Sequence, residues 1–336
     1  MLNRLDNNRG KGVFEATALP VTISSVQPPT AVNLEAIPVQ DGDETKSAAE
    51  DRRYTTSDNL TLHYVFYPGP AERVPVVCLP GLTRNARDFA GIAKHLSAQR
   101  CVYCLEFRGR GRSQWDANPS NYQAPVYVAD TLGILAQEKL DRVIVLGTSL
   151  GGIIGTGVAQ VNPSILAGIV LNDIGPEIDP SGLVRIGSYL GHGDRWKTWD
   201  EAVATLKAVN TVVYPDFTDQ DWLSYARKTC RENEDGLIAQ DYDPALSQGF
   251  AADSAANVDL WPVFDALEAI PALLIRGALS DLLSAETADK MVDRLPNLEL
   301  ETIANRGHVP TLEEPASLSV IEAFVAKVDT LDRQSS

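Results

Sequence analysis

Short apolar runs rich in β-branched residues alternate with helix-like segments along most of the chain. The segments between the runs, such as "RDFAGIAKHLSAQ" and "VADTLGILAQEKL", repeat apolar residues at the helical period. The runs are "TLHYVFY", "VPVVCLP", "CVYCLEF", "RVIVLG", "AGIVLND", "PALLIRG" and "LELETIA". Strands that alternate with helices in this way predict an α/β fold, in which helices cover both faces of a mostly parallel central sheet.

The alternation begins near residue 52 and is interrupted once by a long segment. Residues 176–258 contain helix-like stretches with tryptophans and no convincing buried strand, which predicts a helical cap over the sheet. The core is then formed by residues 52–175 and 259–330. Residues 1–51, rich in Asn, Pro, Thr and Ser, are expected to form a partly irregular extension. The extension either has no chemistry of its own or packs as an arm, on this chain or on a second copy.

The acidic composition limits the partners that the chain can bind. The formal net charge is −16, which repels nucleic acids and anionic membrane surfaces. We therefore expect a small-molecule substrate, no nucleic acid and no membrane partner, and we leave a homodimer open. Four cysteines are too few for a disulfide scaffold. Together with the lack of a signal-like or membrane-spanning apolar run, they predict a soluble cytoplasmic protein.

Ser149 stands in a tight turn between a predicted strand and a predicted helix. "RVIVL" runs directly into residues 147–151, "GTSLG", and "GIIGTGVAQVN" continues as a helix. Such a turn strains the backbone of its central residue and lifts that side chain clear of the sheet. The helix N-terminus favours developing negative charge there. Ser149 is thus a candidate nucleophile. A P-loop would need a lysine before the serine, and the dinucleotide fingerprint GxGxxG cannot be drawn with its first two glycines here. A purely structural turn stays open as the alternative.

Five motifs in chain order resemble those of α/β-hydrolase-fold serine hydrolases, in the esterase or C–C hydrolase-like branch with a helical cap. The motifs are "LPGLTRN" (79–85), "EFRGRGRS" (106–113), "GTSLGG" (147–152), "RGALSD" (276–281) and "NRGHVP" (305–310). The resemblance covers about residues 52–330. It implies, in that order, an oxyanion-hole loop, a structural turn, the nucleophile elbow and the segments that carry the acid and the histidine. Two departures are Glu106, where the family usually has Asp, and "LPG", where many relatives have "HG".

A serine hydroxyl needs a base to take its proton, and His308 is the candidate among four histidines. His308 follows the last predicted strand, at the edge of the sheet where strand C-termini converge. His63 lies in an alternating strand and His95 in an amphipathic helix, so both are expected to be structural. His192 lies in the predicted cap and is a candidate substrate contact.

Asp281 is the predicted acid that orients His308. It follows the strand "PALLIRG" by a short loop, and the chain order Ser149, Asp281, His308 is the order found in α/β hydrolases. Asp173, directly after "IVLN", is the rival acid, since a carboxylate after the preceding strand could also reach the histidine. Without that role, Asp173 is expected to cap a helix or to form part of the pocket wall, where it is a candidate substrate contact.

The remaining predicted groups would stabilise or hold the substrate. The backbone N–H groups of Leu82 and Leu150 are the candidate oxyanion donors. Arg84 and Asn85, on the predicted oxyanion loop, could reach a polar group of the substrate. Arg185, in the cap, is a further candidate cation.

These residues favour a serine hydrolase that cleaves a small or aromatic carboxylic ester through an acyl-enzyme on Ser149, with no cofactor and no metal. The aromatic residues of the cap are expected mostly to form its core, with one or two lining an apolar pocket; they are Tyr189, Trp196, Trp199, Trp222 and Tyr225. Three alternatives stay open. One is a C–C hydrolase of ring-cleavage products, in which Arg84 or Arg185 holds a substrate carboxylate. The others are a lactonase and a slow-turnover small-molecule receptor.

Overall fold

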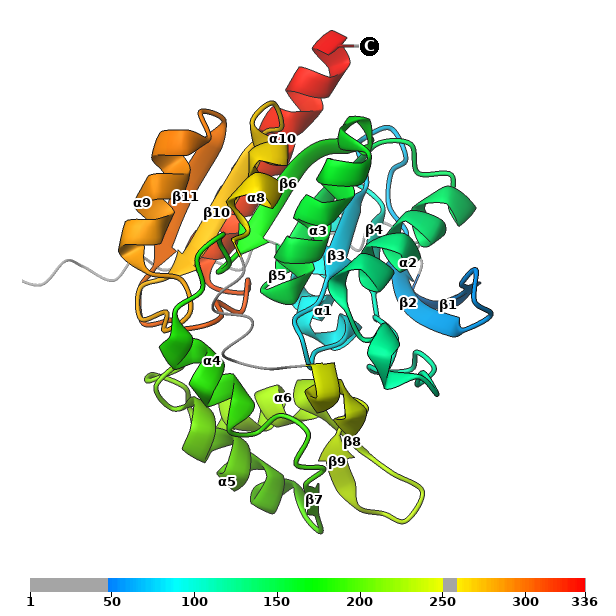
Figure 1. Cartoon of the computed structure of the whole chain (residues 1–336), viewed down its shortest axis with the longest axis vertical. Coiled ribbons are helices and arrows are strands. Elements are labelled where there is room, and N and C mark those ends of the chain that lie inside the picture. Colours follow the sequence, from blue (N-terminus) through cyan, green and yellow to red (C-terminus); the bar gives the residue numbers. More distant parts are fainter. Residues whose placement is uncertain (1–47, 250–258, 336) are drawn as a thin grey trace, which may run out of the picture. The chain divides into compact units, whose positions relative to one another are not determined.

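An eight-stranded sheet organises the described part of the chain, which is residues 48–249 and 259–335 of a computed structural model (Figure 1). The strand order is β1-β2-β4-β3-β5-β6-β10-β11. The strands are β1 (Glu50–Thr55), β2 (Thr61–Tyr67), β3 (Val76–Leu79), β4 (Val102–Leu105), β5 (Val143–Thr148), β6 (Leu166–Asn172), β10 (Ala272–Gly277) and β11 (Leu298–Ile303). β2 is antiparallel to β1 and β4, and all other neighbours are parallel. The predicted α/β architecture is confirmed.

Helices cover both faces of this sheet. In Figure 1, α2 (Ala124–Gln137), α3 (Leu150–Val161), α8 (Trp261–Phe264) and α9 (Ala285–Arg294) lie in front, with α1 (Ala90–Leu96) and α10 (Pro315–Ser335) behind. The residues of β5 alternate between two apolar clusters. Val143 and Val145 belong to the cluster with α2 and α3, and Ile144 and Leu146 to the cluster with α1 and α10. A strand buried on both faces therefore reads as a continuous apolar run.

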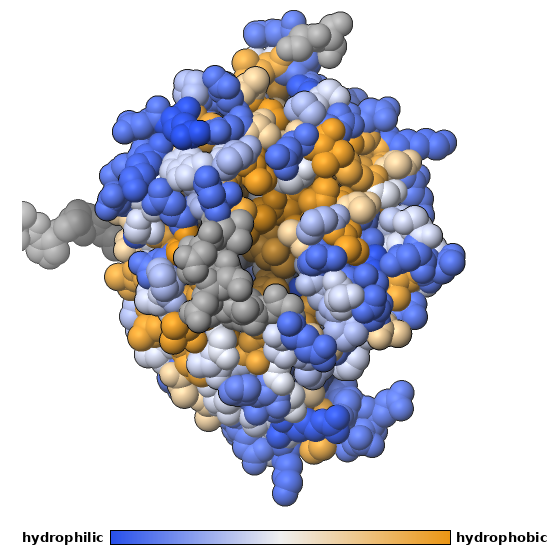
Figure 2. All heavy atoms as spheres, viewed as in Figure 1, coloured by the Kyte–Doolittle hydropathy of each residue, from blue (hydrophilic) through white to orange (hydrophobic). Residues whose placement is uncertain are grey.

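The surface of the molecule is mostly hydrophilic on the face that Figure 2 shows, with apolar residues gathered over α3. The helix reads "LGGIIGTGVAQV", which is apolar almost throughout. No helix in the described ranges is both long and apolar enough to cross a membrane.

The first strand, β1, was not predicted as a separate element and begins two residues before the predicted core boundary at residue 52. It pairs antiparallel with β2 from Glu50↔Phe66 to Thr55↔Thr61. Of the predicted N-terminal extension, only residues 48–51 belong to the described part of the chain.

The predicted cap contains strands as well as helices. Its helices are α4 (Pro180–Gly187), α5 (Trp199–Asn210) and α6 (Asp219–Thr229), followed by the 3-10 turn η4 (Pro244–Gly249). A small antiparallel sheet, β7-β9-β8, joins β7 (Arg195–Trp196), β8 (Cys230–Glu232) and β9 (Ile238–Gln240). The sequence showed no convincing buried strand here and these three short strands were missed, because strands of two or three residues are too short to produce an alternating pattern.

Backbone hydrogen bonds tie the end of the cap to the turn after β4, in addition to those that join Val213 to Gly307 and Asp179 to Leu282. The Gly111 N–H donates to the Asp241 carbonyl at 2.9 Å, and the Asp243 N–H donates to the Gly109 carbonyl at 2.7 Å. Arg87, in the segment after the loop that follows β3, forms an ion pair with the Asp241 carboxylate at 2.7 Å. These contacts link the turn after β4, the loop after β3 and the end of the cap.

Candidate active site

Ser149 occupies the turn between β5 and α3 with strained backbone angles, φ 52° and ψ −117°. An ideal Cβ at Gly147 would lie 2.5 Å from the Gly151 carbonyl oxygen, and one at Gly151 would lie 2.0 Å from the Leu79 carbonyl oxygen. No side chain fits at either position, so the glycines permit the close approach of strand, turn and helix. The Ser149 N–H donates to the Asn172 carbonyl at 3.0 Å, which anchors the turn to β6.

His308 lies between a hydroxyl and a carboxylate. Its Nε2 is 2.9 Å from Ser149 Oγ, and its Nδ1 is 2.8 Å from Asp173 Oδ2. The ring projects from the loop between β11 and α10, and its side chain is 7% exposed. An imidazole whose Nδ1–H is donated to a carboxylate presents a free Nε2 lone pair to the serine hydroxyl. This arrangement can remove the serine proton and later return it to a leaving group.

Asp173 is fully buried directly after β6, with a positive φ of 55° that aspartate tolerates better than most residues. Its Oδ1 accepts the Gly277 N–H at 2.8 Å. Its Oδ2 accepts the hydroxyl of Ser280 at 2.6 Å in addition to the ring of His308. Ser280 Oγ in turn accepts the N–H of Leu283 at 3.0 Å, so its proton is directed at the carboxylate. The hydrogen bonds of the buried Asp173 carboxylate are thus made to protein groups, namely Gly277, Ser280 and His308.

Asp281 does not contact His308, contrary to the prediction. Its carboxylate accepts two hydrogen bonds from Arg185 of α4, at 2.6 and 2.8 Å. Burial would raise the pKa of Asp281, but the hydrogen bonds and charge of Arg185 outweigh burial and lower this pKa below its usual value. The prediction failed because Asp173 and Asp281 follow the neighbouring strands β6 and β10 at one edge of the sheet. Chain order alone could not distinguish between them.

The sequence did give a signal for Asp173, since it stands directly after the buried strand next to the Ser149 strand. Ser280 was not singled out. It occupies the loop after β10, where the family resemblance implies an acid, and contacts the acid instead of replacing it.

A cavity of about 410 Å³ opens over Ser149 and His308. Gly81 lies beside the serine, since an ideal Cβ there would be 3.8 Å from Ser149 Cβ. Leu82 lines the cavity in the same loop. Leu150 is the first residue of α3, so its N–H has no acceptor within the helix. Both predicted oxyanion donors therefore belong to segments that meet at Ser149.

Arg110 holds the loop that carries Leu82, a role that the sequence did not indicate. Its Nε donates to the Leu82 carbonyl at 2.8 Å, and its Nη1 donates to the Arg108 carbonyl and the Tyr127 hydroxyl, each at 2.7 Å. The side chain is fully buried, and its Nη2 has no hydrogen-bond partner among the described residues. Burial lowers the pKa of Arg110.

The turn "EFRGRGRS" is built around buried charges rather than a nucleic-acid surface. Arg108 is 1% exposed and is held by the carboxylates of Asp58, Asp116 and Asp130 at 2.6 to 2.9 Å. Glu106 Oε2 accepts the Arg112 N–H at 2.6 Å and contacts His63 Nδ1 at 2.9 Å. The family departure at this position therefore keeps a carboxylate that organises the turn.

The other predicted substrate contacts divide into two pairs. Arg84 and Arg185 both line the cavity. Asn85 is buried and does not line it; its Nδ2 donates to the Lys228 carbonyl at 3.1 Å. His192 is exposed and is also absent from the cavity lining, so the prediction of a substrate contact there was wrong for the arrangement that the structure shows.

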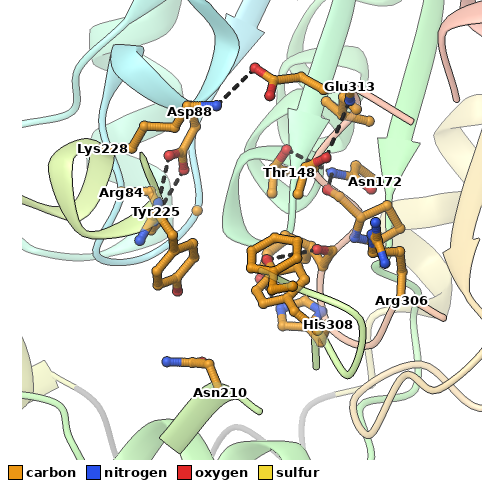
Figure 3. Close-up of a pocket in the computed structure, with 18 of the residues that line it drawn as sticks. Arg84, Asp88, Thr148, Asn172, Asn210, Tyr225, Lys228, Arg306, His308 and Glu313 are labelled. Atoms are coloured by element: carbon orange, nitrogen blue, oxygen red, sulfur yellow. Dashed lines mark hydrogen bonds and ion pairs between the residues drawn. The ribbon is translucent and has the colours of Figure 1, made fainter. Parts of the chain in front are cut away.

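Every cation that lines the cavity in the described ranges is paired with a carboxylate. Arg84 pairs with Asp88 at 2.6 Å, on the side of the cavity opposite His308 (Figure 3). The other pairs are Arg185–Asp281 at 2.6 Å, Lys228–Glu313 at 2.8 Å and Arg306–Glu314 at 2.8 Å. The described residues contain no group of three or more His, Cys, Asp and Glu side chains that could hold a metal ion.

The aromatic residues of the cap have the two predicted roles. Trp196 and Trp222 are buried in the apolar clusters of the cap, and Trp199 packs against one of these clusters. Tyr189 and Tyr225 line the cavity.

Residues 76–319 match the model of the family described as "Alpha/beta hydrolase family". The chain is 37% identical over 263 residues to 3-hydroxybutyrate-oligomer hydrolase of Cupriavidus necator, which covers 76% of this chain and 89% of that protein. It is 24% identical over 248 residues to 2-(acetamidomethylene)succinate hydrolase of Mesorhizobium japonicum, covering 73% and 85%. A crystal structure of an alpha/beta hydrolase from Novosphingobium aromaticivorans is similar at 44% identity and a TM-score of 0.80, covering 83% of this chain and 98% of that one.

Proposed function

The chain belongs to the alpha/beta hydrolase family, and from that premise we propose that it hydrolyses carboxylic esters through an acyl-enzyme on Ser149. The observation that carries the proposal is the position of the His308 ring, 2.9 Å from Ser149 Oγ and 2.8 Å from Asp173 Oδ2. A hydroxyl, an imidazole and a buried carboxylate in this order make a serine nucleophilic at neutral pH.

In the proposed mechanism, Ser149 Oγ attacks the ester carbonyl while His308 Nε2 takes its proton. The N–H groups of Leu82 and Leu150 stabilise the oxyanion of the tetrahedral intermediate. His308 then donates the proton to the leaving alcohol, and an acyl-enzyme remains. Water, deprotonated by the same ring, releases the acid. Asp173 keeps the ring oriented and stabilises the imidazolium without being protonated itself.

The proposed substrate is a short oligoester of a small hydroxy acid, such as 3-hydroxybutyrate. The 37% identical relative, of which the match covers 89%, supports this substrate class, as does a cavity of about 410 Å³, which suits a small ligand. A C–C hydrolase of ring-cleavage products has less support, because Arg84 and Arg185 are already paired with Asp88 and Asp281. A lactone is also an ester and would use the same groups, so lactonase activity remains a second reaction of the same site.

The test is hydrolysis of three substrates by the purified full-length protein, with product acids followed by chromatography. We expect cleavage of p-nitrophenyl butyrate and of the linear 3-hydroxybutyrate trimer, and no cleavage of a ring-cleavage dienone acid. Ser149→Ala should lower kcat by about four orders of magnitude with an unchanged melting temperature. Cleavage of the dienone acid alone, or wild-type turnover in Ser149→Ala, would contradict the proposal. Ligand-dependent change in the cap with negligible turnover of all three substrates would favour a receptor.

A further inference from the structure

Three cap segments each present a polar group to the cavity opposite the Ser149 site. Tyr189 follows α4, Asn210 ends α5 and Tyr225 lies in α6, and all three line the cavity. Neither phenol hydroxyl has a hydrogen-bond partner among the described residues, although both side chains are largely buried. Asn210 Nδ2 donates to the Leu206 carbonyl at 2.9 Å, which fixes the amide with its oxygen free to accept.

Tyr225 is held so that its hydroxyl faces the open space. Arg84 lies over its ring, with the guanidinium carbon 4.7 Å from the ring centroid, and Trp222 packs edge-on with a centroid distance of 5.9 Å. Figure 3 shows the hydroxyl end of Tyr225 pointing into the space between His308 and Asn210. A ring held by these two contacts is restricted in its movement, which lowers the entropy lost when a ligand binds its hydroxyl.

Both phenols act as neutral hydrogen-bond donors. Burial raises the pKa of Tyr225. Burial, and next the neighbouring Tyr225, raise the pKa of Tyr189. Neutral phenols that line an open cavity and have no protein partner can donate to an acceptor oxygen of a bound ligand.

The charge pairing of the cavity indicates what kind of oxygen this is. A substrate carboxylate would need an unpaired cation to bind here. Arg84, which lies over the Tyr225 ring, and Arg185, which also lines the cavity, are each already bound to a carboxylate. A negatively charged group of the substrate would also be repelled by the carboxylates of Asp88 and Asp281. Neutral acceptors, namely ester carbonyls and hydroxyl groups, meet no such opposition.

We infer that Tyr189 and Tyr225 form a subsite that binds a neutral oxygen, an ester carbonyl or a hydroxyl, of a substrate unit beyond the ester attacked by Ser149. The inference rests on the proposed function and deepens it. The subsite would make the protein selective for substrates that repeat an oxygen-bearing unit. A simple alkyl ester fills the reaction site and leaves both phenols unpaired. An oligoester supplies them with acceptors, and such a polar site discriminates more strongly than an apolar one.

The test compares kcat/KM for the 3-hydroxybutyrate trimer with kcat/KM for p-nitrophenyl butyrate, which has no oxygen beyond its scissile ester on the acyl side. The ratio of these two values should fall about 3- to 10-fold in Tyr189→Phe and in Tyr225→Phe, mainly through KM for the trimer. In the double variant it should fall further. Tyr67→Phe is the matched control, because Tyr67 lies in β2 outside the cavity and should keep the wild-type ratio.

A second arm uses the methyl ester of the trimer with the wild-type protein. Because the subsite binds neutral oxygen, removing the terminal carboxylate charge should change kcat/KM by less than about threefold. A loss of tenfold or more would identify a carboxylate contact and overturn the inference. An unchanged selectivity ratio in the double variant would also overturn it while leaving the proposed function intact. A wild-type protein that cleaves p-nitrophenyl butyrate but not the trimer would contradict the proposed substrate and the inference together.

Discussion

At the scale of single residues, the proposed mechanism depends on which carboxylate faces the His308 imidazole. Asp173 is fully buried and accepts bonds from Gly277, Ser280 and His308. Asp281 is more exposed and its charge is neutralised by Arg185. A carboxylate that is already satisfied by a guanidinium cannot stabilise an imidazolium as strongly as one whose acceptor oxygen is directed at the ring.

The first prediction compares the two acids. Asp173→Asn should lower kcat for p-nitrophenyl butyrate by about 10³- to 10⁴-fold, because the amide favours the wrong histidine tautomer. Asp281→Asn should lower kcat by less than about tenfold, with its main effect on stability, because Arg185 loses its charged partner. Both values come from steady-state kinetics, with melting temperatures as the control. The opposite ranking of the two variants would contradict the role proposed for Asp173.

The second prediction concerns Ser280 as a positioning residue. Ser280→Ala removes the hydroxyl that donates to Asp173 Oδ2 at 2.6 Å, so kcat should fall about tenfold. Ser280→Thr keeps a hydroxyl and should restore most of the activity. If Ser280→Thr were as slow as Ser280→Ala at equal melting temperature, the hydrogen bond would not be the cause.

At the scale of elements, the loop after β3 and the turn after β4 act together. Arg110, in the turn after β4, donates to the Leu82 carbonyl, and the same turn exchanges backbone hydrogen bonds with the end of the cap. The hydrogen bond from Arg110 therefore fixes the loop after β3 before substrate binds. Preorganised donors of this kind lower the barrier because they need not reorient as charge develops.

The third prediction tests this arrangement. Arg110→Met should lower kcat by about 10- to 100-fold with a much smaller change in KM, because the Leu82 N–H is proposed to stabilise the transition state rather than the bound ester. Arg112→Met, at an exposed position in the same turn, is the matched control and should stay within about twofold. Arg110→Lys provides a second variant if the methionine variant folds poorly. A loss of stability with unchanged kcat in both would show a purely structural role.

At the scale of the whole molecule, buried charge clusters make stability depend on acid pH. Hydrogen bonds from Arg108, and next from Thr56, lower the pKa of Asp58 to about 2. A carboxylate with a lowered pKa stabilises the folded state above the ordinary value near 4, and this stabilisation is lost as the pH falls through about 2.

The fourth prediction follows from the lowered pKa of Asp58, which makes its carboxylate stabilising at neutral pH and not in strong acid. Asp58→Asn should lower the melting temperature by about 1–3 °C at pH 7, a small effect because the carboxylate is half-exposed and screened. The difference from wild type should shrink as the pH falls from 4 towards 2. Asp289→Asn, at an exposed position on α9, is the control and should match the wild type throughout. A difference that persists or grows in acid would contradict the assignment of the charge.

Much of the molecule was predictable from its sequence because burial leaves a periodic pattern. The parallel strands appear as apolar runs, and the glycines around Ser149 indicate a turn in which no Cβ fits. The position of His308 beyond the last strand also followed. The choice of acid did not, because two aspartates follow adjacent strands and only the direction of each loop separates them. The short cap strands and the role of Arg110 depend on contacts between distant segments, which leave no local pattern.

The most direct test of the account is to react the full-length protein with a fluorophosphonate probe and to identify the modified residue by peptide mass spectrometry. We predict a single modification on Ser149, with a labelling rate that falls by at least about 10³-fold in His308→Ala, because the ring supplies the base that activates the hydroxyl. Modification of a different residue, or labelling of Ser149 at the wild-type rate without the imidazole, would contradict the central claim.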